Sequence, residues 1–228
     1  MSGKKMRFAA GAALALGLFV TSQTARAALL TLDDVTTPGD PITVVNGISD
    51  DATVADGSGN NPPLAEGVAN AIDNTTTKYL NFLDFNSGFV VSPTKGARGG
   101  GTIVRALRLY SANDDSRRDP ASFILEGAQS PTGPFSVLAV SNVNLPGDRN
   151  APGLTIDPNT QNFTTYAFNN TTAYKTYRLT FPTLRDGVGA NSMQIGEVEL
   201  LGTVVPEPAA LGLLGLGALG LLARRRRA

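Results

Sequence analysis

The side chains of this chain that could carry chemistry are restricted to carboxylates, hydroxyls, amides and basic groups. Its 228 residues include no histidine and no cysteine. This composition excludes disulfide bonds, thiol catalysis, histidine-assisted serine catalysis and zinc sites built from Cys or His. A metal would need oxygen ligands, which favours calcium, and acid–base catalysis would need a pair of carboxylates.

The most regular carboxylate pair is Glu197 and Glu199. Residues two apart on a strand point to the same face, so these two side chains should lie together. Such pairs are common on ordinary strands, and no other carboxyl marks the far side of a cleft. We therefore predict a non-enzymatic protein, with a glycan-active hydrolase as the less favoured alternative.

A second acidic group lies in the segment NDDSRRDP at residues 113–120. Its three aspartates offer oxygen ligands, but Arg117 and Arg118 neutralise them, and the terminal glutamate of an EF-hand is absent. The segment is better explained as a loop held by Asp/Arg pairs and a turn at Asp119-Pro120. The three aspartates are Asp114, Asp115 and Asp119.

Aromatic and arginine side chains in loops are the natural groups for binding a sugar, since rings stack on the apolar faces of carbohydrates. The sequence predicts Tyr79, Phe82 and Arg117 as ligand-binding residues. Further candidates of the same kinds are Phe85, Arg98 and Arg149.

The elements that would position these residues are short strands. Between residues 30 and 202 no stretch keeps a helical period, and short β-branched or aromatic runs alternate with Gly, Pro, Asn and Asp. This spacing favours an all-β fold, an antiparallel β-sandwich of the jelly-roll kind. The expected strands lie within residues 102–112, 122–128, 135–140, 164–169, 176–181 and 194–202.

The first 27 residues have the pattern of a secretory signal peptide. Lys4, Lys5 and Arg7 precede an apolar stretch that is too short to span a bilayer comfortably. Ala25 and Ala27 form an A-x-A cleavage site for signal peptidase, which predicts a mature start at Ala28. A buried N-terminal helix is the alternative.

The C-terminal end has a second apolar stretch, residues 209–222, followed by Arg224, Arg225, Arg226 and Arg227. The stretch is short for a permanent anchor, and the arginines favour the cytoplasmic side. Together with Pro206, Glu207 and Pro208, residues 204–228 resemble the PEP-CTERM sorting signal, which joins a Pro-Glu-Pro motif, a short transmembrane helix and an arginine cluster. An ordinary tail anchor is the alternative.

The PEP-CTERM resemblance implies export across the inner membrane of a Gram-negative bacterium that makes exopolysaccharide. It also implies transient insertion in that membrane and processing by a membrane-embedded exosortase. The mature protein would then be displayed at the cell surface or released into the extracellular matrix.

Three segments between the two ends resemble a known domain family. They are NAIDNTTTKYLNF (70–82), RLYSANDDSRRDPASFILEGA (108–128) and YRLTFPTLRDGVGANSMQIGEVELLG (177–202). In order and spacing they are similar to the discoidin or coagulation-factor type C domains, which have the galactose-binding-like fold. The resemblance implies a β-sandwich over residues 28–203 with ligand loops at one end.

The same resemblance implies a structural calcium ion held by Asp73, Thr77 and Glu197. Two departures from the family pattern bear on this site. Asn74 stands where the family usually has glycine, although asparagine tolerates a left-handed backbone, and the loop is about one residue short. The alternative places Asp73 in a turn and Glu197 on a solvent-facing strand.

Charge also bears on the partners. Eight of the 19 basic residues lie in the two ends, which leaves 11 basic and 18 acidic residues in the middle, a net charge of about −7. An acidic body argues against nucleic-acid binding. We predict an exported surface protein that binds glycan, exopolysaccharide or matrix components, with a matrix protein lacking a specific ligand as the alternative.

Overall fold

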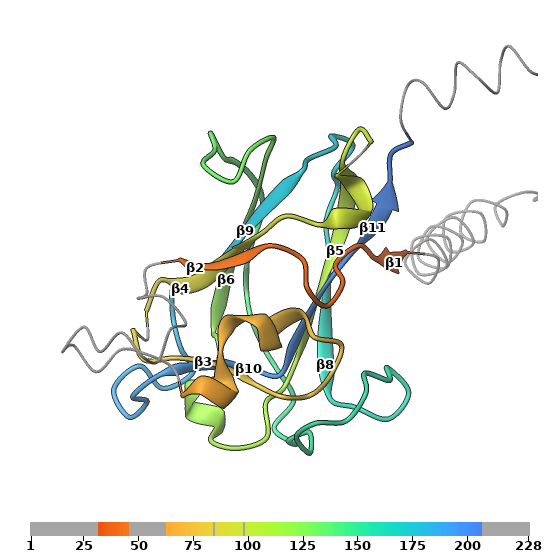
Figure 1. Cartoon of the computed structure of the whole chain (residues 1–228). Coiled ribbons are helices and arrows are strands. Elements are labelled where there is room, and N and C mark those ends of the chain that lie inside the picture. The colour runs from red at the N-terminus through yellow and green to blue at the C-terminus, as the bar shows by residue number, and fades with distance from the viewer. Residues whose placement is uncertain (1–31, 46–62, 84, 98, 207–228) are drawn as a thin grey trace, which may run out of the picture. The chain divides into compact units, whose positions relative to one another are not determined.

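The computed structural model describes residues 32–45, 63–83, 85–97 and 99–206. These residues form strands joined by loops and by four short 3-10 helices (Figure 1). The helices are η1 (Leu64–Glu66), η2 (Val68–Ile72), η3 (Thr94–Gly96) and η4 (Ser116–Arg118).

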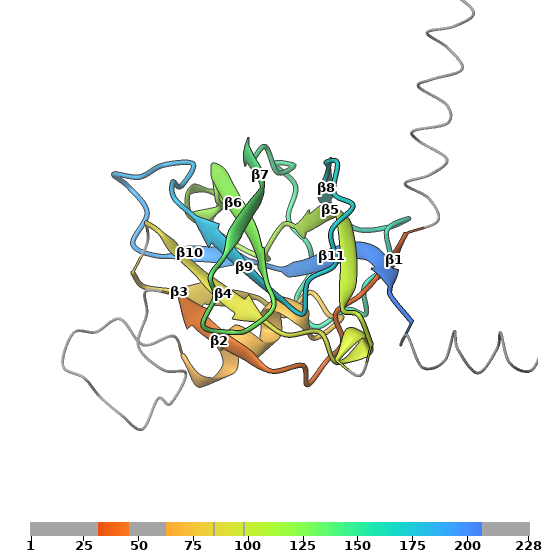
Figure 2. The ribbon, with the colours of Figure 1, turned by 90° about the horizontal axis from the view of Figure 1, so that it is seen from above.

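The strands build two large antiparallel sheets and a small two-stranded one. The first has the order β1-β11-β5-β8, and the second has the order β2-β4-β9-β6-β7. Figure 2 shows the second sheet as a succession from β7 to β2. The first sheet contains β1 (Asp33–Asp34), β11 (Glu197–Val204), β5 (Thr102–Tyr110) and β8 (Phe163–Ala167). The second contains β2 (Ile42–Val45), β4 (Ser87–Val91), β9 (Thr176–Phe181), β6 (Ser122–Ala128) and β7 (Ser136–Asn142).

The core lies between these sheets. Alternate residues of β5 and β11, such as Leu107 and Leu200, pack with alternate residues of the second sheet, such as Phe89, Phe123 and Leu179. Strands alternate their side chains between two faces, so each sheet contributes one apolar face to the sandwich. The predicted antiparallel β-sandwich is confirmed.

All six predicted runs form strands, but the last one is divided. Met193–Ile195 forms β10, which pairs with β3 (Tyr79–Asn81), while β11 begins at Glu197. Gly196 lies between them, and a Cβ there would lie 2.5 Å from the Ser111 carbonyl oxygen. Only glycine permits this close approach, which lets the chain move from the small pair into the first sheet.

Several predicted features lie outside the described residues. These are the signal peptide with Ala25 and Ala27, the apolar stretch at residues 209–222, Glu207, Pro208 and the four C-terminal arginines. Within the described ranges, no helix combines the length and hydropathy that a membrane crossing requires.

Candidate functional site

Several loops are joined at the end of the sandwich where β11 begins. Backbone hydrogen bonds connect the β5–β6 loop to the β9–β10 loop: Ala121 N–H donates to Thr183 O (2.8 Å), and Arg185 N–H donates to Asp119 O (2.9 Å). The turn before β3 is joined to the β7–β8 loop by Thr76 N–H donating to Leu154 O (2.8 Å). This loop end therefore brings together segments that are far apart in the sequence.

A buried carboxylate fixes three of these loops. Asp119 has no exposed surface, and its two oxygens accept hydrogen bonds of 2.7 Å each from Arg149. Arg185 lies 3.4 Å from the same carboxylate. The predicted local Asp/Arg pair is present between Arg117 and Asp115, at 2.6 Å, whereas the partners of Asp119 come from other loops.

Glu197 lies at the first position of β11 and is completely buried. Its Oε1 accepts a 3.3 Å hydrogen bond from Asn74 N–H, and its Oε2 has no hydrogen-bond partner. Burial raises the pKa of Glu197 to about 10, and the negative charge of Asp73 adds to the rise. The solvent-facing alternative for Glu197 is therefore wrong.

Asp73 reaches Glu197 from the turn before β3. Asn74 has a φ of 60°, so it adopts the left-handed backbone expected from the sequence. Asp73 Oδ1 accepts from Thr75 N–H at 2.7 Å, and burial raises the pKa of Asp73. Thr77 is joined to this turn because its Oγ1 accepts from the Thr75 hydroxyl at 2.8 Å.

The oxygen atoms of Asp73, Thr77 and Glu197 could supply part of the coordination of a hard cation. Two carboxylates of raised pKa lie close together, and one buried carboxylate oxygen lacks a partner. A cation would compensate both features. Across the described ranges no group of three or more acidic side chains is arranged to hold a metal, so hydroxyl or carbonyl oxygens would have to complete the coordination.

Lys78 is a buried cation in the same segment that the sequence did not single out. Its Nζ lies 2.6 Å from Asp114 Oδ2 in the β5–β6 loop and 3.3 Å from Glu66 Oε1 in η1. Its side chain is only 8% exposed. Burying an ammonium group is costly unless it is paired, so this lysine connects the turn before β3 to the β5–β6 loop.

The β5–β6 loop also gathers polar groups with unused hydrogen-bonding capacity. In the described part of the chain, the buried atoms without a partner include Asn113 Oδ1, Arg118 Nε and Gln194 Oε1. Gln194 Nε2 donates to Asp115 O at 2.8 Å, so all three residues belong to or contact this loop. Buried polar atoms normally have partners, so these three atoms mark a place where buried water would complete the hydrogen bonds.

Two candidate ligand residues lie at the surface of the same loop end. Phe85 is 41% exposed, and its Cζ would lie 2.8 Å from a Cβ placed on Gly187. The side chain of Arg117 is 56% exposed, and its Nη1 would lie 3.3 Å from a Cβ on Gly189. The ring and the guanidinium therefore both lie against the β9–β10 loop.

The other ligand candidates have different surroundings. Tyr79 is 0% exposed in β3, and its hydroxyl donates to Gly88 O at 3.2 Å. Its ring cannot stack on a ligand, so the sequence prediction for Tyr79 is wrong. Phe82 is half-buried, Arg149 is bound to Asp119, and Arg98 lies outside the described residues.

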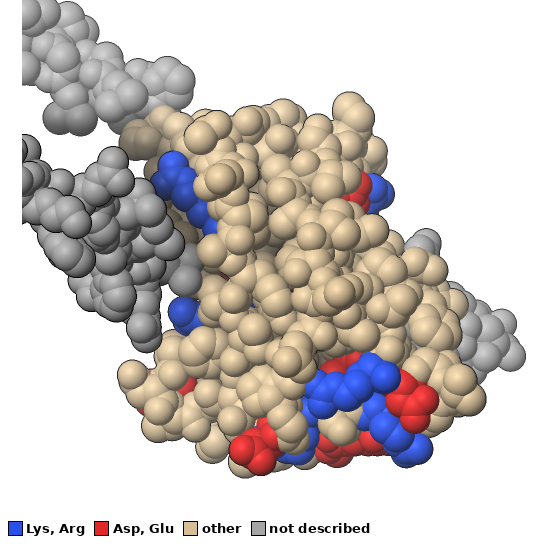
Figure 3. Space-filling model, turned by 180° about the vertical axis from the view of Figure 1, so that it is seen from behind, with Lys and Arg blue, Asp and Glu red and all other residues tan. Residues whose placement is uncertain are grey.

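Figure 3 shows where charge gathers on the face seen from behind. Basic and acidic side chains are concentrated together at the lower end, and most of the remaining face has neither. The same end holds η4 in Figure 1. The candidate site is thus a mixed-charge region with an exposed arginine, beside a broad uncharged surface.

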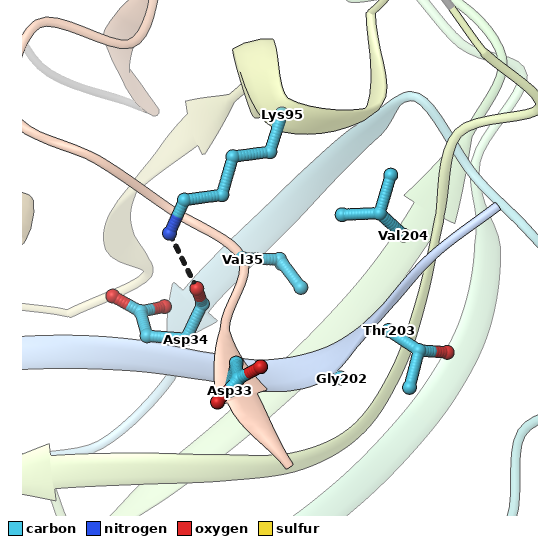
Figure 4. A pocket seen from close by; sticks show the side chains of 7 residues that line it. All are labelled: Asp33, Asp34, Val35, Lys95, Gly202, Thr203 and Val204. Carbon is cyan, nitrogen blue, oxygen red and sulfur yellow. Dashed lines mark hydrogen bonds between the residues drawn. The ribbon is translucent and has the colours of Figure 1, made fainter. Parts of the chain in front are cut away.

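A hollow of about 580 Å³ lies at the other end of β11, lined by Asp33, Asp34, Val35, Lys95 and residues 202–204. Lys95 Nζ donates to Asp34 O at 2.7 Å (Figure 4). The Asp34 carboxylate accepts from Thr36 and from Leu200 N–H, although burial raises its pKa to about 6. These polar groups satisfy one another.

The last described residues lead directly into the sorting segment. Val204 pairs with Thr102, Val205 N–H donates to Gly101 O at 2.9 Å, and Gly100 N–H donates to Val205 O at 3.2 Å. Pro206 follows, the first residue of the predicted Pro-Glu-Pro motif. The folded sheet therefore extends to the beginning of this motif.

Comparison with known proteins agrees with the sequence at this terminus. Residues 204–227 match the family model described as the PEP-CTERM protein-sorting motif. No curated protein sequence matches the chain.

Solved structures with a similar fold include carbohydrate-binding modules. CpGH89CBM32-5 from Clostridium perfringens, in complex with GalNAc-beta-1,3-galactose, is 12% identical, with a TM-score of 0.45, 70% of this chain covered and 92% of that chain. Chitosan-binding module 1 from a Paenibacillus sp. IK-5 chitosanase/glucanase is 13% identical, with a TM-score of 0.44 and coverages of 73% and 97%.

A third such structure is the family 32 CBM from C. perfringens NanJ in complex with galactose. It is 12% identical, with a TM-score of 0.42 and coverages of 61% of this chain and 86% of that chain. The chain thus has a PEP-CTERM sorting motif after an antiparallel β-sandwich.

Proposed function

We propose that this chain is an exported, non-enzymatic surface or matrix protein that binds carbohydrate at the loop end of its sandwich. In this proposal, signal peptidase removes residues 1–27, and an exosortase processes the protein near Pro206, Glu207 and Pro208 after transient insertion in the inner membrane. The ligand would be a component of the cell's own exopolysaccharide or matrix.

The observation that carries the binding proposal is the pair of exposed side chains, Phe85 and Arg117, that lie against the β9–β10 loop. The Phe85 ring would supply a stacking surface for a sugar, and the Arg117 guanidinium would donate hydrogen bonds to its hydroxyls. The unpaired Asn113 Oδ1, Gln194 Oε1 and Arg118 Nε are buried, so a sugar would reach them only through a bridging water molecule.

We propose a structural role for calcium at Asp73 and Glu197, with oxygens of the Asp73–Thr77 turn as further ligands. Both carboxyls have raised pKa values, and Glu197 Oε2 has no partner. Calcium would supply the missing charge compensation and stabilise the folded state by binding it preferentially.

The environment of the only regular carboxylate pair supports a non-enzymatic role. Glu199 accepts a 2.7 Å hydrogen bond from Arg108 and a 3.0 Å hydrogen bond from the Tyr110 hydroxyl. Its proximity to Glu197 raises the pKa of Glu197 only as a minor contribution. Glu199 is thus engaged in an ion pair, which argues against an acid–base pair facing a substrate.

Binding can be tested with the full-length chain, produced without exosortase and purified in mild detergent. We expect retention on exopolysaccharide from a native host and saturable binding on a glycan array, stronger with calcium chloride than with EDTA. No retention on any polysaccharide would contradict the carbohydrate proposal and favour a matrix protein without a specific ligand.

Export and sorting have a separate test. Intact mass and terminal sequencing of the mature protein should give an N-terminus at Ala28 and a new C-terminus near residues 206–208. An intact C-terminal arginine cluster at the surface would contradict exosortase processing.

A further inference from the structure

We infer that the glycine loop at residues 99–101 limits the processing of the sorting motif. It holds Val205, the residue before Pro206, in the folded sheet, and the processing enzyme can bind the motif only after Val205 is released. This inference rests on the proposal that an exosortase cleaves the chain near residues 206–208. It assigns the rate of that cleavage to the stability of one strand end.

The first observation is that backbone pairing continues up to the motif. β11 pairs with β5 as far as Val204. Beyond it, Val205 N–H donates to Gly101 O at 2.9 Å, and Gly100 N–H donates to Val205 O at 3.2 Å. Both backbone polar groups of Val205 are therefore bonded to the glycine loop, and Pro206 is the next residue.

The second observation is the contact between the Val205 side chain and the glycine loop. A Cβ added at Gly100 would lie 2.7 Å from Val205 Cγ1 and 3.2 Å from Val205 Cβ, so a side chain at this position would displace the valine. Gly101 has a φ of +91°, a backbone conformation that glycine adopts without strain. The glycines thus allow the loop to lie directly against the residue that precedes the motif.

The glycine loop is also fixed by contacts that do not involve Val205. Gly99 N–H donates to Gly96 O of η3 at 3.2 Å. Directly after the loop, Thr102 and Tyr174 exchange two backbone hydrogen bonds, of 2.8 and 2.9 Å. The loop can therefore keep its position when Val205 leaves it.

Among the described residues, the end of β11 is paired on one side only. The last described pair between β1 and β11 joins Asp33 to Gly202, and beyond it Thr203 and Val204 line the hollow (Figure 4). Strand ends with few hydrogen bonds open at a much lower free energy than the whole domain. Val205 can therefore be released without unfolding of the sandwich.

Val205 cannot enter a protease active site while it is bound to the glycine loop. An extended peptide is recognised through its backbone N–H and C=O groups, and both groups of Val205 are engaged by Gly100 and Gly101. Cleavage near Pro206 therefore requires the released state. When opening and closing are fast, the cleavage rate follows the population of that state.

The first test follows processing by pulse-chase and intact mass in a host that contains an exosortase. Gly100→Ala places a Cβ against Val205 and leaves residues 203–208 unchanged, so we expect cleavage about fivefold faster than in the wild type. Hydrogen exchange of the Val205 amide, measured on the uncleaved full chain in detergent, should accelerate by a similar factor. Gly147→Ala is the matched control, because its added Cβ has open space, and it should be processed like the wild type.

A reversible covalent link tests the opposite change. The chain has no cysteine, and a Cβ at Gly100 would lie 3.2 Å from that of Val205, near the Cβ spacing of a disulfide, about 3.5–4.5 Å. On membranes that contain an exosortase, the oxidised double variant Gly100→Cys/Val205→Cys should stay uncleaved, and reduction with dithiothreitol should restore cleavage. Val205→Cys alone controls for the changed residue beside the motif and should be cleaved under both conditions.

Three outcomes would overturn the inference. They are cleavage of the oxidised double variant at the wild-type rate, unchanged cleavage of Gly100→Ala despite faster exchange of Val205, and equal acceleration by Leu125→Ala. Leu125 is a buried core residue of β6, so the last outcome would mean that cleavage follows unfolding of the whole domain. If Gly100→Ala leaves the exchange unchanged, the disulfide variant carries the test.

The outcomes also separate this inference from the sorting proposal. If the wild type is not cleaved near residues 206–208 in the exosortase host, the sorting proposal is wrong and this inference is wrong with it. If the wild type is cleaved there but oxidation of the double variant has no effect, the sorting proposal stands and only this inference is wrong.

Discussion

The two ends of β11 differ in how their polar groups are satisfied. At the beginning of the strand, the buried Glu197 has an oxygen without a partner and lies close to another carboxyl. At the other end, the hollow near Val204 is lined by groups that bond to one another, and Val205 exchanges backbone hydrogen bonds with Gly100 and Gly101.

This difference separates a binding end from a structural end of one strand. Buried groups with unused bonding capacity cost stability unless a ligand or ion compensates them. Within the described ranges, the buried polar atoms without a partner all lie at the loop end, and none lies at the end that leads into the sorting motif. Substitutions at the two ends should therefore affect different properties.

The largest effect on stability is expected from Asp119→Ala at the loop end. It would leave Arg149 and Arg185 without their buried acceptor, at a cost of about 3–5 kcal/mol in the free energy of unfolding. Urea denaturation measures this cost. The control Asp115→Ala removes the partner of the exposed Arg117 and the hydrogen bond from Arg117 N–H that caps η4, and it should cost clearly less than Asp119→Ala. Equal costs would contradict the proposed importance of burial at Asp119.

The next effect concerns the pH dependence of the cation-free protein. The unfolded Glu197 carboxyl ionises near its ordinary pKa of 4.5, whereas the folded one keeps its proton to about pH 10. Folding therefore binds a proton in this window, and the contribution of Glu197 to stability is greatest below pH 4.5 and falls as pH rises toward 10. Asp34, with its pKa raised to about 6, adds a smaller fall at lower pH.

Glu197→Gln should remove most of this dependence and raise the unfolding free energy at pH 8 in EDTA. It should also abolish the stabilisation by calcium, which is measured from urea midpoints with and without the ion. A variant that keeps both the pH slope and the calcium effect would show that Glu197 is not the group responsible.

Gly101→Ala tests the structural end. Gly101 has a φ of +91°, and a Cβ there would lie 2.4 Å from Tyr174 O. We expect a loss of about 1–3 kcal/mol in stability with unchanged calcium affinity by calorimetry. The control Gly147→Ala has open space around the added Cβ and should be nearly neutral. A changed calcium affinity in Gly101→Ala would mean that the ends are not independent.

The smallest effect on stability is expected from Arg117→Ala, because its side chain is 56% exposed. Retention on polysaccharide should nevertheless weaken by about tenfold if Arg117 contacts the ligand. Lys175→Ala removes an equal charge from an exposed position and should leave retention unchanged. Equal weakening in both variants would indicate a general charge effect.

The longer strands could be predicted from the sequence, because alternating apolar residues in runs such as residues 102–110 determine which face of the strand is buried. β3 could not be predicted, because its three residues are too few for an alternating pattern to be recognised. That is why Tyr79 was predicted as a surface ligand residue although it belongs to the core. The sorting motif was predictable because its signal is contiguous in the chain.

By itself, the sequence determined the sandwich class, the sorting motif, the lack of histidine and cysteine chemistry, and the Asp73–Asn74 turn, since each depends on local pattern or composition. Only the tertiary structure decided which charges meet: Lys78 with Asp114, and Asp119 with Arg149. It also decided that Glu197 is buried with an unpaired oxygen. The physical reason is that ion pairing and desolvation depend on distances in space, and these residues are brought together only by folding.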